Sequence, residues 1–260
     1  MMHQMKLQNS PFMKIKNGIK TIELRLNDKK RQQVQVGDFI EFTLIDNSDE
    51  KIQTRVTALH HFDSFQELYA SLPKEKLGYS PSETPVPDHM DAFYPREKQE
   101  KYGALGIELR MTDLQKFIDA QDNGYGFGET YETAFAEIRE GLKNTCWMWY
   151  VFPQIQGLGT SGTTALFSIR DIEEAKDYYA HPVLRERLLE ITKSLLDIEC
   201  NDPMVVFGDP DAYKLRSCMT LFKYAAPEQK LFQQILDKFC CGTEDDKTLE
   251  IIGDGENNAE

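Results

Sequence analysis

Lys20, Glu23 and Arg25 place two cations and one carboxylate on a single short segment of the chain. Apolar and polar residues alternate strictly from Lys20 to Leu26, which is the pattern of a half-buried β-strand. These charges can act together as a clamp, because a carboxylate accepts hydrogen bonds from a ligand amine and a guanidinium donates them to anions. A surface ladder of salt bridges is the alternative interpretation, in which the charges only pair with one another.

This strand belongs to a wider basic segment, from Lys14 to Arg31, that contains seven basic residues and two acidic ones. A local excess of positive charge can meet a phosphate group, so Lys14 and Lys16 are further candidates for ligand contact. A solvated basic edge of a small domain is the alternative. Farther along the chain, Tyr94 and Tyr102 offer aromatic faces on which a base can stack.

A second set of polar residues lies in the C-terminal half and can form an anion or nucleotide pocket, because cations with hydroxyl and amide donors suit phosphate. Its members are Lys143, Gln154, His181, Lys214, Arg216 and Ser217. His181 directly precedes a proline, and a helix-capping or packing role is the alternative for it. The loop Gly157 to Gly159 is too short for a dinucleotide fingerprint, so no cofactor is expected.

The charge of the chain is divided unevenly between its halves. Residues 1–112 contain 16 Lys and Arg and 16 Asp and Glu, so the formal net charge of −13 belongs entirely to the residues from 113 onward. The acidic half repels the phosphates of any RNA that the N-terminal basic segment binds. We therefore expect weak binding that depends strongly on salt. The acidic half is a candidate for binding a protein partner.

The composition indicates a soluble cytoplasmic protein without a membrane partner. The longest uninterrupted apolar stretch, Trp147 to Phe152, is far shorter than the roughly 18 residues of a membrane-spanning helix, and the N-terminus has no apolar core of a secretory signal. The five cysteines form no C-x-x-C pair, and no histidine stands at zinc-finger spacing. We therefore expect a reducing compartment and no metal site.

Several short strands must position the candidate residues of the first half. Apolar and polar residues alternate in four ranges, and each alternation predicts a strand. These ranges are 20–26, 39–45, 52–59 and 102–110. A short helix is expected between Phe12 and Ile19, and the capping pattern from Ser64 to Glu67 starts another. The proline-rich stretch 79–92 predicts a loop that can cover a site, so the half is expected to be a small, mainly antiparallel β-barrel with an inserted helix.

From Thr112 onward the apolar period changes from two residues to 3.6, which predicts a mainly helical half and an α+β protein overall. The expected helices lie around residues 114–121, 131–142, 172–179, 184–195, 211–222 and 232–239. The aromatic run 147–152 is expected in the core, because large aromatic side chains bury much apolar area. We therefore expect domains at 1–110 and 111–253, followed by an acidic disordered tail at 254–260.

Six motifs of the first half follow one another at defined spacing. They are Phe12, residues 15–25 with Gly18, Lys20, Glu23 and Arg25, residues 36–42, residues 63–68, Tyr94-Pro95 and Tyr102-Gly103. In order and spacing these motifs resemble an ASCH domain over about residues 8–110. The resemblance implies a barrel similar to the RNA-binding (PUA) domain of pseudouridine synthases and archaeosine transglycosylases. It also implies that the strand with Lys20 binds RNA or a nucleoside.

Some ASCH-like enzymes are amidohydrolases that remove the acetyl group from acetylated cytidine, using a lysine, a threonine three residues later and a glutamate elsewhere. The resemblance makes Lys20 and Glu23 the catalytic candidates, but Glu23 stands where that threonine is expected. We expect its carboxylate to keep Lys20 protonated, which suits a ligand clamp better than a nucleophile pair. Thr21 is a conceivable substitute hydroxyl, and an ordinary strand threonine is the alternative.

The second half carries a further set of motifs. They are residues 117–121, 146–154, 181–184, 207–208 and 214–222. Together they resemble a bacterial domain of unknown function that is often mislabelled calpastatin. In that family a histidine commonly stands at the position of Cys146. The resemblance implies a helical fold and no chemistry.

Three hypotheses for the function of the protein follow. The first is an RNA- or nucleoside- and nucleotide-binding protein that uses the ASCH-like cleft. The others are an amidohydrolase acting on an acylated or modified nucleoside, and a protein-interaction scaffold.

Overall fold

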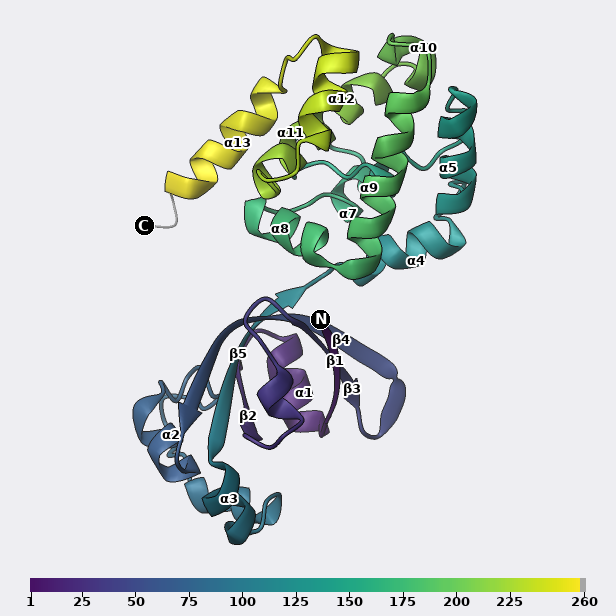
Figure 1. Ribbon diagram of the computed structural model, residues 1–260. Helices are drawn as coiled ribbons and strands as arrows, with labels where there is room; N and C mark the ends of the chain where they lie inside the picture. Colours follow the sequence, from purple (N-terminus) through teal and green to yellow (C-terminus); the bar gives the residue numbers. More distant parts are fainter. Residues whose placement is uncertain (258–260) are drawn as a thin grey trace. The chain divides into compact units, whose positions relative to one another are not determined.

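The computed structural model describes residues 1–257, and the chain divides into two compact units, Met1–Asp113 and Leu114–Glu260 (Figure 1). The first unit is a five-stranded curled half-barrel with helices, and the second consists of helices. The predicted α+β class is therefore confirmed. Within the described residues, no helix is both long and apolar enough to cross a membrane.

The sheet of the first unit has the strand order β1-β3-β4-β5-β2, so β1 and β2 are its two edges. The bounds are β1 Met2–Leu7, β2 Ile22–Leu26, β3 Phe39–Leu44, β4 Asn47–Phe62 and β5 Ala104–Thr112. Strand β1 pairs with β3 in parallel, and all other pairs are antiparallel. The four predicted strands are confirmed, whereas β1 was not expected.

The long strand β4 joins the two halves of this sheet. Its first part pairs with β3, and its second part pairs with β5. The register shifts between Val56 and Ala58, where one extra residue lies on the β4 side of the ladder. Such a bulge increases the local twist and bends the strand, which helps the sheet to curl.

Helix α1 (Asn9–Lys16) lies inside the curl of the sheet (Figure 1). Its buried residues Phe12 and Ile15 share one apolar core with Ile40 and Phe42 of β3 and with Ile107 of β5. Burying an aliphatic or aromatic side chain of this size stabilises a fold by about 1.5–3 kcal/mol. The short helix expected before β2 is therefore confirmed, and it fills the half-barrel.

The other helices of the first unit lie in the connections between strands. Their bounds are η1 Arg31–Gln33, α2 Phe65–Ser71, η2 Pro87–Ala92 and α3 Arg96–Tyr102, where η marks a 3-10 helix. Helix α2 begins with the predicted Ser64 cap: Ser64 Oγ accepts from the Glu67 backbone N–H at 3.1 Å, and the Glu67 carboxylate accepts from the N–H of Asp63, one residue before the N-cap. The stretch 79–92, predicted as a loop, is irregular except for η2.

The second unit contains ten helices within the described residues. Their bounds are α4 Gln115–Asn123, α5 Tyr131–Glu140, α6 Met148–Val151, α7 Gly162–Leu166, α8 Ile172–Ala180, α9 Pro182–Asp197, α10 Pro203–Phe207, α11 Asp211–Ala225, α12 Leu231–Cys240 and α13 Asp246–Asn257. Six of them match the predicted helices. Helix α11 packs against α8, α10, α12 and α13, and is the centre of the unit.

The aromatic run of the second unit lies in its core, as predicted. Trp147 and Phe152 are fully buried, and Tyr150 is 1% exposed. The run is anchored by Glu137 of α5, whose Oε2 accepts hydrogen bonds from the Trp147 indole N–H at 2.7 Å and from the backbone N–H groups of residues 144 and 145 at 2.9 and 3.2 Å. This carboxylate therefore closes the turn that follows α5.

The end of the chain differs from the prediction. Helix α13 spans Asp246–Asn257, so the segment 254–257, expected to be disordered, continues a helix. Thr248 and Ile252 of α13 are buried, one turn apart on the same face. Burial of that face stabilises a helix whose sequence alone reads as an acidic tail. The rest of the predicted tail, residues 258–260, lies outside the described residues.

Candidate functional site

The candidate residues Glu23 and Arg25 belong to β2, which is an edge strand of the half-barrel. Glu23 pairs with Ile107 and Arg25 with Leu105 of β5. Lys20 precedes the strand, and its backbone N–H donates to the Lys14 carbonyl at 3.0 Å. The backbone of β2 and its bond to the end of α1 therefore determine where all three charged side chains leave the main chain.

Glu23 lies between the two cations. Its Oε2 is 3.5 Å from Lys20 Nζ, and its Oε1 is 3.1 Å from Arg25 Nε. Lys20 and Glu23 are 7% and 5% exposed. The predicted pairing of these residues is therefore present, but as a buried cluster and not as a ladder on the surface. Removing one partner of a buried pair leaves the other charge uncompensated, so each member depends on the others.

Backbone carbonyl groups hold the cations in place. Lys20 Nζ donates to the Leu77 carbonyl at 3.4 Å, and Lys14 Nζ donates to the Gly78 carbonyl at 2.8 Å. Gly78 has φ +91°, and a Cβ at this position would lie 3.0 Å from Lys20 Cβ and 3.2 Å from Lys14 Cδ. Both the backbone conformation and the close approach of the lysines therefore require glycine here.

Arg25 links the two edges of the sheet. Its Nη2 donates to the Lys6 carbonyl at the end of β1, at 2.9 Å. Residues of β1 and of β2 both line one cavity of about 400 Å³. The site therefore lies where the half-barrel is open, between its two edge strands.

The pKa of Lys20 differs from the expectation. Burial lowers the pKa of this amine below its usual value, and it outweighs the opposite effect of the Glu23 carboxylate. The sequence shows Glu23 as a neighbour but does not show how deeply Lys20 is buried. The expected effect of Glu23, which raises the pKa of Lys20, is therefore present, but burial has the larger effect.

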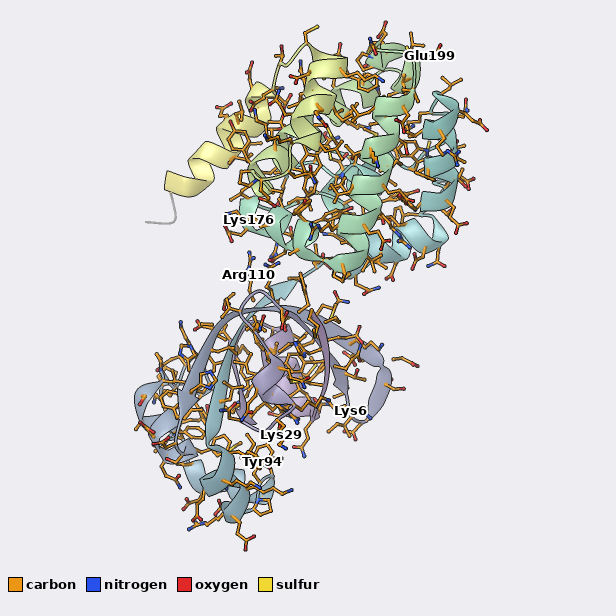
Figure 2. The ribbon with its side chains drawn as sticks, viewed as in Figure 1. Lys6, Lys29, Tyr94, Arg110, Lys176 and Glu199 are labelled. Atoms are coloured by element: carbon orange, nitrogen blue, oxygen red, sulfur yellow. The ribbon has the colours of Figure 1, made fainter. Side chains whose placement is uncertain are left out.

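Aromatic side chains form the rest of the cavity wall. Tyr69, Tyr79, Phe93 and Tyr94 line it together with Lys6, which is labelled with Tyr94 in Figure 2. The hydroxyl groups of Tyr69 and Tyr79 are 3.4 Å apart, and burial with this contact raises the pKa of Tyr69 above its usual value. A cavity with one charged end and aromatic walls can hold a flat polar ring. The aromatic side chains contact the face of the ring, and the charged groups form hydrogen bonds with its polar edge.

The structure brings together most of the predicted site residues of the first unit. Lys20, Glu23, Arg25 and Tyr94 line the cavity. Lys14 adjoins it, because its ammonium lies 5.7 Å from the centre of the Tyr79 ring.

The remaining predicted residues lie elsewhere. Lys16 is exposed and pairs with Glu50 at 2.6 Å, because the end of α1 points this side chain away from the cavity. Tyr102 lines a different depression next to Lys101 at the end of α3. Thr21, the suggested substitute hydroxyl, does not line the cavity with Lys20 and Glu23. These three residues therefore lie outside the lining of this cavity.

Sequence reasoning missed Lys6, Tyr69 and Tyr79. The alternation of buried His3, Met5 and Leu7 was an available signal for β1 and hence for the position of Lys6. Neither tyrosine has a local pattern that marks it, because only the tertiary fold brings α2 and the loop after it to β2.

The second candidate cluster is only partly assembled. Gln154, Lys214, Arg216 and Ser217 line a cavity of about 560 Å³ in the second unit. Lys143 reaches this group indirectly, through an ion pair with Asp211 at 2.7 Å. His181 lies between α8 and α9, is 3% exposed, and has its pKa lowered by burial to about 4. It therefore occupies a packed helix junction and not the lining of the cavity, which agrees with the packing role given as its alternative.

Comparison with known families gives two matches. Residues 5–113 match the ASCH domain. Residues 111–252 match the family described as protein of unknown function (DUF1810). Both resemblances expected from the sequence are thus confirmed. No curated protein matches the chain.

Three solved structures are similar to parts of the chain. A conserved hypothetical protein from Mycobacterium tuberculosis is 36% identical with a TM-score of 0.51, over 54% of this chain and 96% of its own. A hypothetical protein is 29% identical with a TM-score of 0.37, over 43% of this chain and 99% of its own. A protein from Pyrococcus furiosus is 32% identical with a TM-score of 0.34, over 44% and 99% of the two chains.

Proposed function

The chain belongs to the DUF1810 family and carries an N-terminal ASCH domain, and from this premise we propose that it binds RNA, a nucleoside or a nucleotide in the cavity of the first unit. One observation carries the proposal: the buried charges of Lys20 and Glu23 and the half-buried Arg25 face a cavity that aromatic side chains also line. The ASCH domain has a PUA-like fold that is often linked to RNA binding, and this agrees with the chemistry of the cavity.

The proposed binding mode assigns one role to each kind of side chain. Glu23 accepts a hydrogen bond from an exocyclic amine or ring N–H of the base, because carboxylate oxygens are strong acceptors. A tyrosine, such as Tyr94, stacks on the flat face of the ring. Lys14 and Lys6 lie at the rim, where a phosphate of a nucleotide or of an RNA strand can meet them. The volume of about 400 Å³ is in the range of small-molecule sites.

An amidohydrolase acting on an acylated or modified nucleoside is the second candidate function, and the lowered pKa of Lys20 favours it. A neutral lysine amine can take a proton from a hydroxyl or a water molecule that attacks an amide carbonyl. Binding without turnover remains our proposal, because Glu23 occupies the position at which the resembling enzymes have their threonine, and Thr21 does not line the cavity.

Two further parts of the proposal concern the surroundings of the protein. The second unit carries nearly all of the net negative charge, and this excess favours a basic protein partner for it. The spacing of the five cysteines is typical of a protein of the reducing cytoplasm, where we place this chain.

The test is a thermal-shift screen of the full chain against free nucleosides, mononucleotides and short single-stranded RNAs, since a ligand that binds the native state raises the melting temperature. The best binder is then titrated into wild type and Glu23→Gln. We expect Glu23→Gln to weaken binding by about 1–3 kcal/mol, because one charged hydrogen bond is lost.

Glu50→Gln is the matched control, because Glu50 belongs to the same unit and pairs with Lys16 outside the cavity. It should bind like wild type. Equal affinity of wild type and Glu23→Gln would contradict the proposed site. Deacetylation of an acetylated cytidine by the wild type, lost in Lys20→Ala, would establish the amidohydrolase instead.

A further inference from the structure

The second unit contains a cavity that the proposed function does not use. It has a volume of about 560 Å³, within the range of small-molecule sites. Lys214, Arg216 and Ser217 of α11 line it together with Gln154 and with Lys247 of α13. Helices α11 and α13 lie side by side in Figure 1 and are in contact. Three cations therefore converge on one cavity within the most acidic part of the chain.

Lys214 is held in place by a charge network that keeps a positive excess. Asp211 Oδ1 is 2.7 Å from Lys214 Nζ, and Asp211 Oδ2 is 2.7 Å from Lys143 Nζ. One carboxylate thus serves two ammonium groups, and the group of three retains one positive charge. The Lys214 ammonium also lies 4.5 Å from the centre of the Trp149 ring, whose face attracts a cation.

Arg216 keeps most of its hydrogen-bonding capacity. A guanidinium has five N–H donors, and the distance of 3.5 Å from Nη2 to Asp245 Oδ1 is longer than a normal hydrogen bond. The other oxygen of Asp245 is committed to α13, where it accepts from the Thr248 N–H at 3.0 Å and from the Thr248 hydroxyl at 2.7 Å. Asp245 therefore orients Arg216 without saturating it.

Polar groups of other kinds complete the wall of the cavity. Gln154 brings an amide donor, and Ser217 brings a hydroxyl, which here donates to the Tyr213 carbonyl at 3.1 Å and can rotate towards a ligand. Asp245 and Asp246 also line the cavity, and the Asp245 carboxylate has the Arg216 guanidinium as its neighbour. Carboxylates at this border can accept hydrogen bonds from hydroxyl or amino groups on the rest of a ligand.

We propose that this cavity binds the phosphate group of a small phosphorylated molecule. A phosphate has several strong acceptor oxygens, and the fork of Arg216, the ammonium of Lys214 and the amide of Gln154 supply donors of complementary charge and geometry. The cavity is larger than a phosphate ion, which leaves room for the organic part beside the exposed ring of Tyr213.

The test uses inorganic phosphate as the probe and the full chain labelled with nitrogen-15. Phosphate is titrated at constant ionic strength maintained with sodium chloride, and backbone amide resonances are followed by NMR. We expect saturable shifts at residues 214–217 and 247, and none when chloride alone is varied. Arg216→Gln should weaken the binding about tenfold or more, which corresponds to the loss of a charged hydrogen bond.

Lys230→Gln is the control, because it removes the same charge from an exposed position outside the cavity. It should bind phosphate like wild type. Lys247→Gln provides a second variant on an exposed residue, so a failure of Arg216→Gln to fold does not end the test. The proposal is overturned if no saturable shift occurs, if the cavity variants bind as well as wild type, or if acetate produces the same shifts and phosphate has no advantage.

Discussion

Glu23 and Glu137 are two buried glutamates, one in each unit, and their carboxylates are satisfied in different ways. They are 5% and 7% exposed. Glu137 accepts hydrogen bonds from two backbone N–H groups and one indole N–H, all of which are fixed by the fold. Glu23 has two side-chain cations, Lys20 and Arg25, and faces a cavity.

This difference separates a structural carboxylate from one that is available to a ligand. Burial alone would raise the pKa of Glu137, but the hydrogen bonds from Asn144, Trp147 and Thr145 outweigh it and hold the pKa below its usual value. At Glu23 the partners are side chains that a ligand can compete with or recruit. Burial of a charge is therefore a poor guide to function, and the nature of its partners is a better one.

The largest expected effect is on stability, at Glu137. Glu137→Ala should lower the free energy of unfolding of the second unit by about 3 kcal/mol, because one buried donor and two partly buried donors lose their acceptor at once. Both tryptophans, Trp147 and Trp149, belong to this unit, so urea unfolding of the full chain followed by tryptophan fluorescence reports on it. Glu140→Ala, at an exposed position of the same helix, should change the midpoint little. Similar losses in both variants would mean that Glu137 has no special role.

The next effect concerns the backbone that supports the Glu23 site. Gly78→Ala should destabilise the first unit by about 1–2 kcal/mol for the left-handed conformation, and further by pushing the Lys20 and Lys14 side chains. Gly18→Ala is the matched variant, since Gly18 also has a positive φ but no atom lies within 4 Å of its added Cβ. Hydrogen exchange of the β2 amides in the full chain should show the larger loss for Gly78→Ala. Equal losses in the two variants would mean that the side chains of Lys14 and Lys20 move aside without a further loss of stability.

A smaller effect is expected on the dependence of stability on pH. The pKa of Glu137 is lowered in the folded state from 4.5, so its contribution is complete above pH 4.5 and is lost as the pH falls through the folded value. Glu137→Gln cannot titrate, and its fluorescence-monitored stability should fall less steeply than that of wild type below pH 4.5. Parallel curves for the two proteins would contradict the role of the hydrogen bonds.

The smallest effect is expected on salt dependence at the Glu23 site. The rim lysines Lys14 and Lys6 can meet phosphates, and Lys6 is exposed, whereas Lys20 is buried. Two phosphate contacts should weaken short RNA binding by roughly five- to tenfold between 50 and 200 mM salt, and a free nucleoside should be affected much less. Isothermal titration at several salt concentrations measures both. RNA binding that does not depend on the salt concentration would mean that the ligand lies away from the rim lysines.

Local pattern was sufficient for most elements of the fold and for the charged end of the site. Strict alternation identified β2, and the capping box identified α2. Strand β1 was missed because its buried face includes His3 and because its partner β3 is distant and parallel. Helix α13 was missed because tertiary packing of Thr248 and Ile252, and not its composition, supports it.

The limits of prediction at the site have the same origin. Spacing along β2 brought Lys20, Glu23 and Arg25 together, since a strand fixes its own neighbours. The lowered pKa of Lys20 depends on burial beneath Leu77 and Gly78, and the position of Tyr69 depends on α2. Neither the burial of Lys20 nor the position of Tyr69 is encoded in nearby residues. The charged residues of the cavity were therefore predictable from the sequence, and its aromatic walls were not.

The pairing of the edge strands also determines when the site can form during synthesis. Strand β2, which carries Glu23 and Arg25, has β5 as its sheet partner, and Ile22 pairs with Glu108. The ribosome must therefore release residues 104–112 before β2 has a neighbour, and contacts between such distant segments form slowly. Until then the side chains of Lys20 and Glu23 remain hydrated, and burial does not yet lower the pKa of Lys20. The cavity of the first unit is consequently among the last parts of that unit to form, although Lys20, Glu23 and Arg25 precede most of its strands in the sequence.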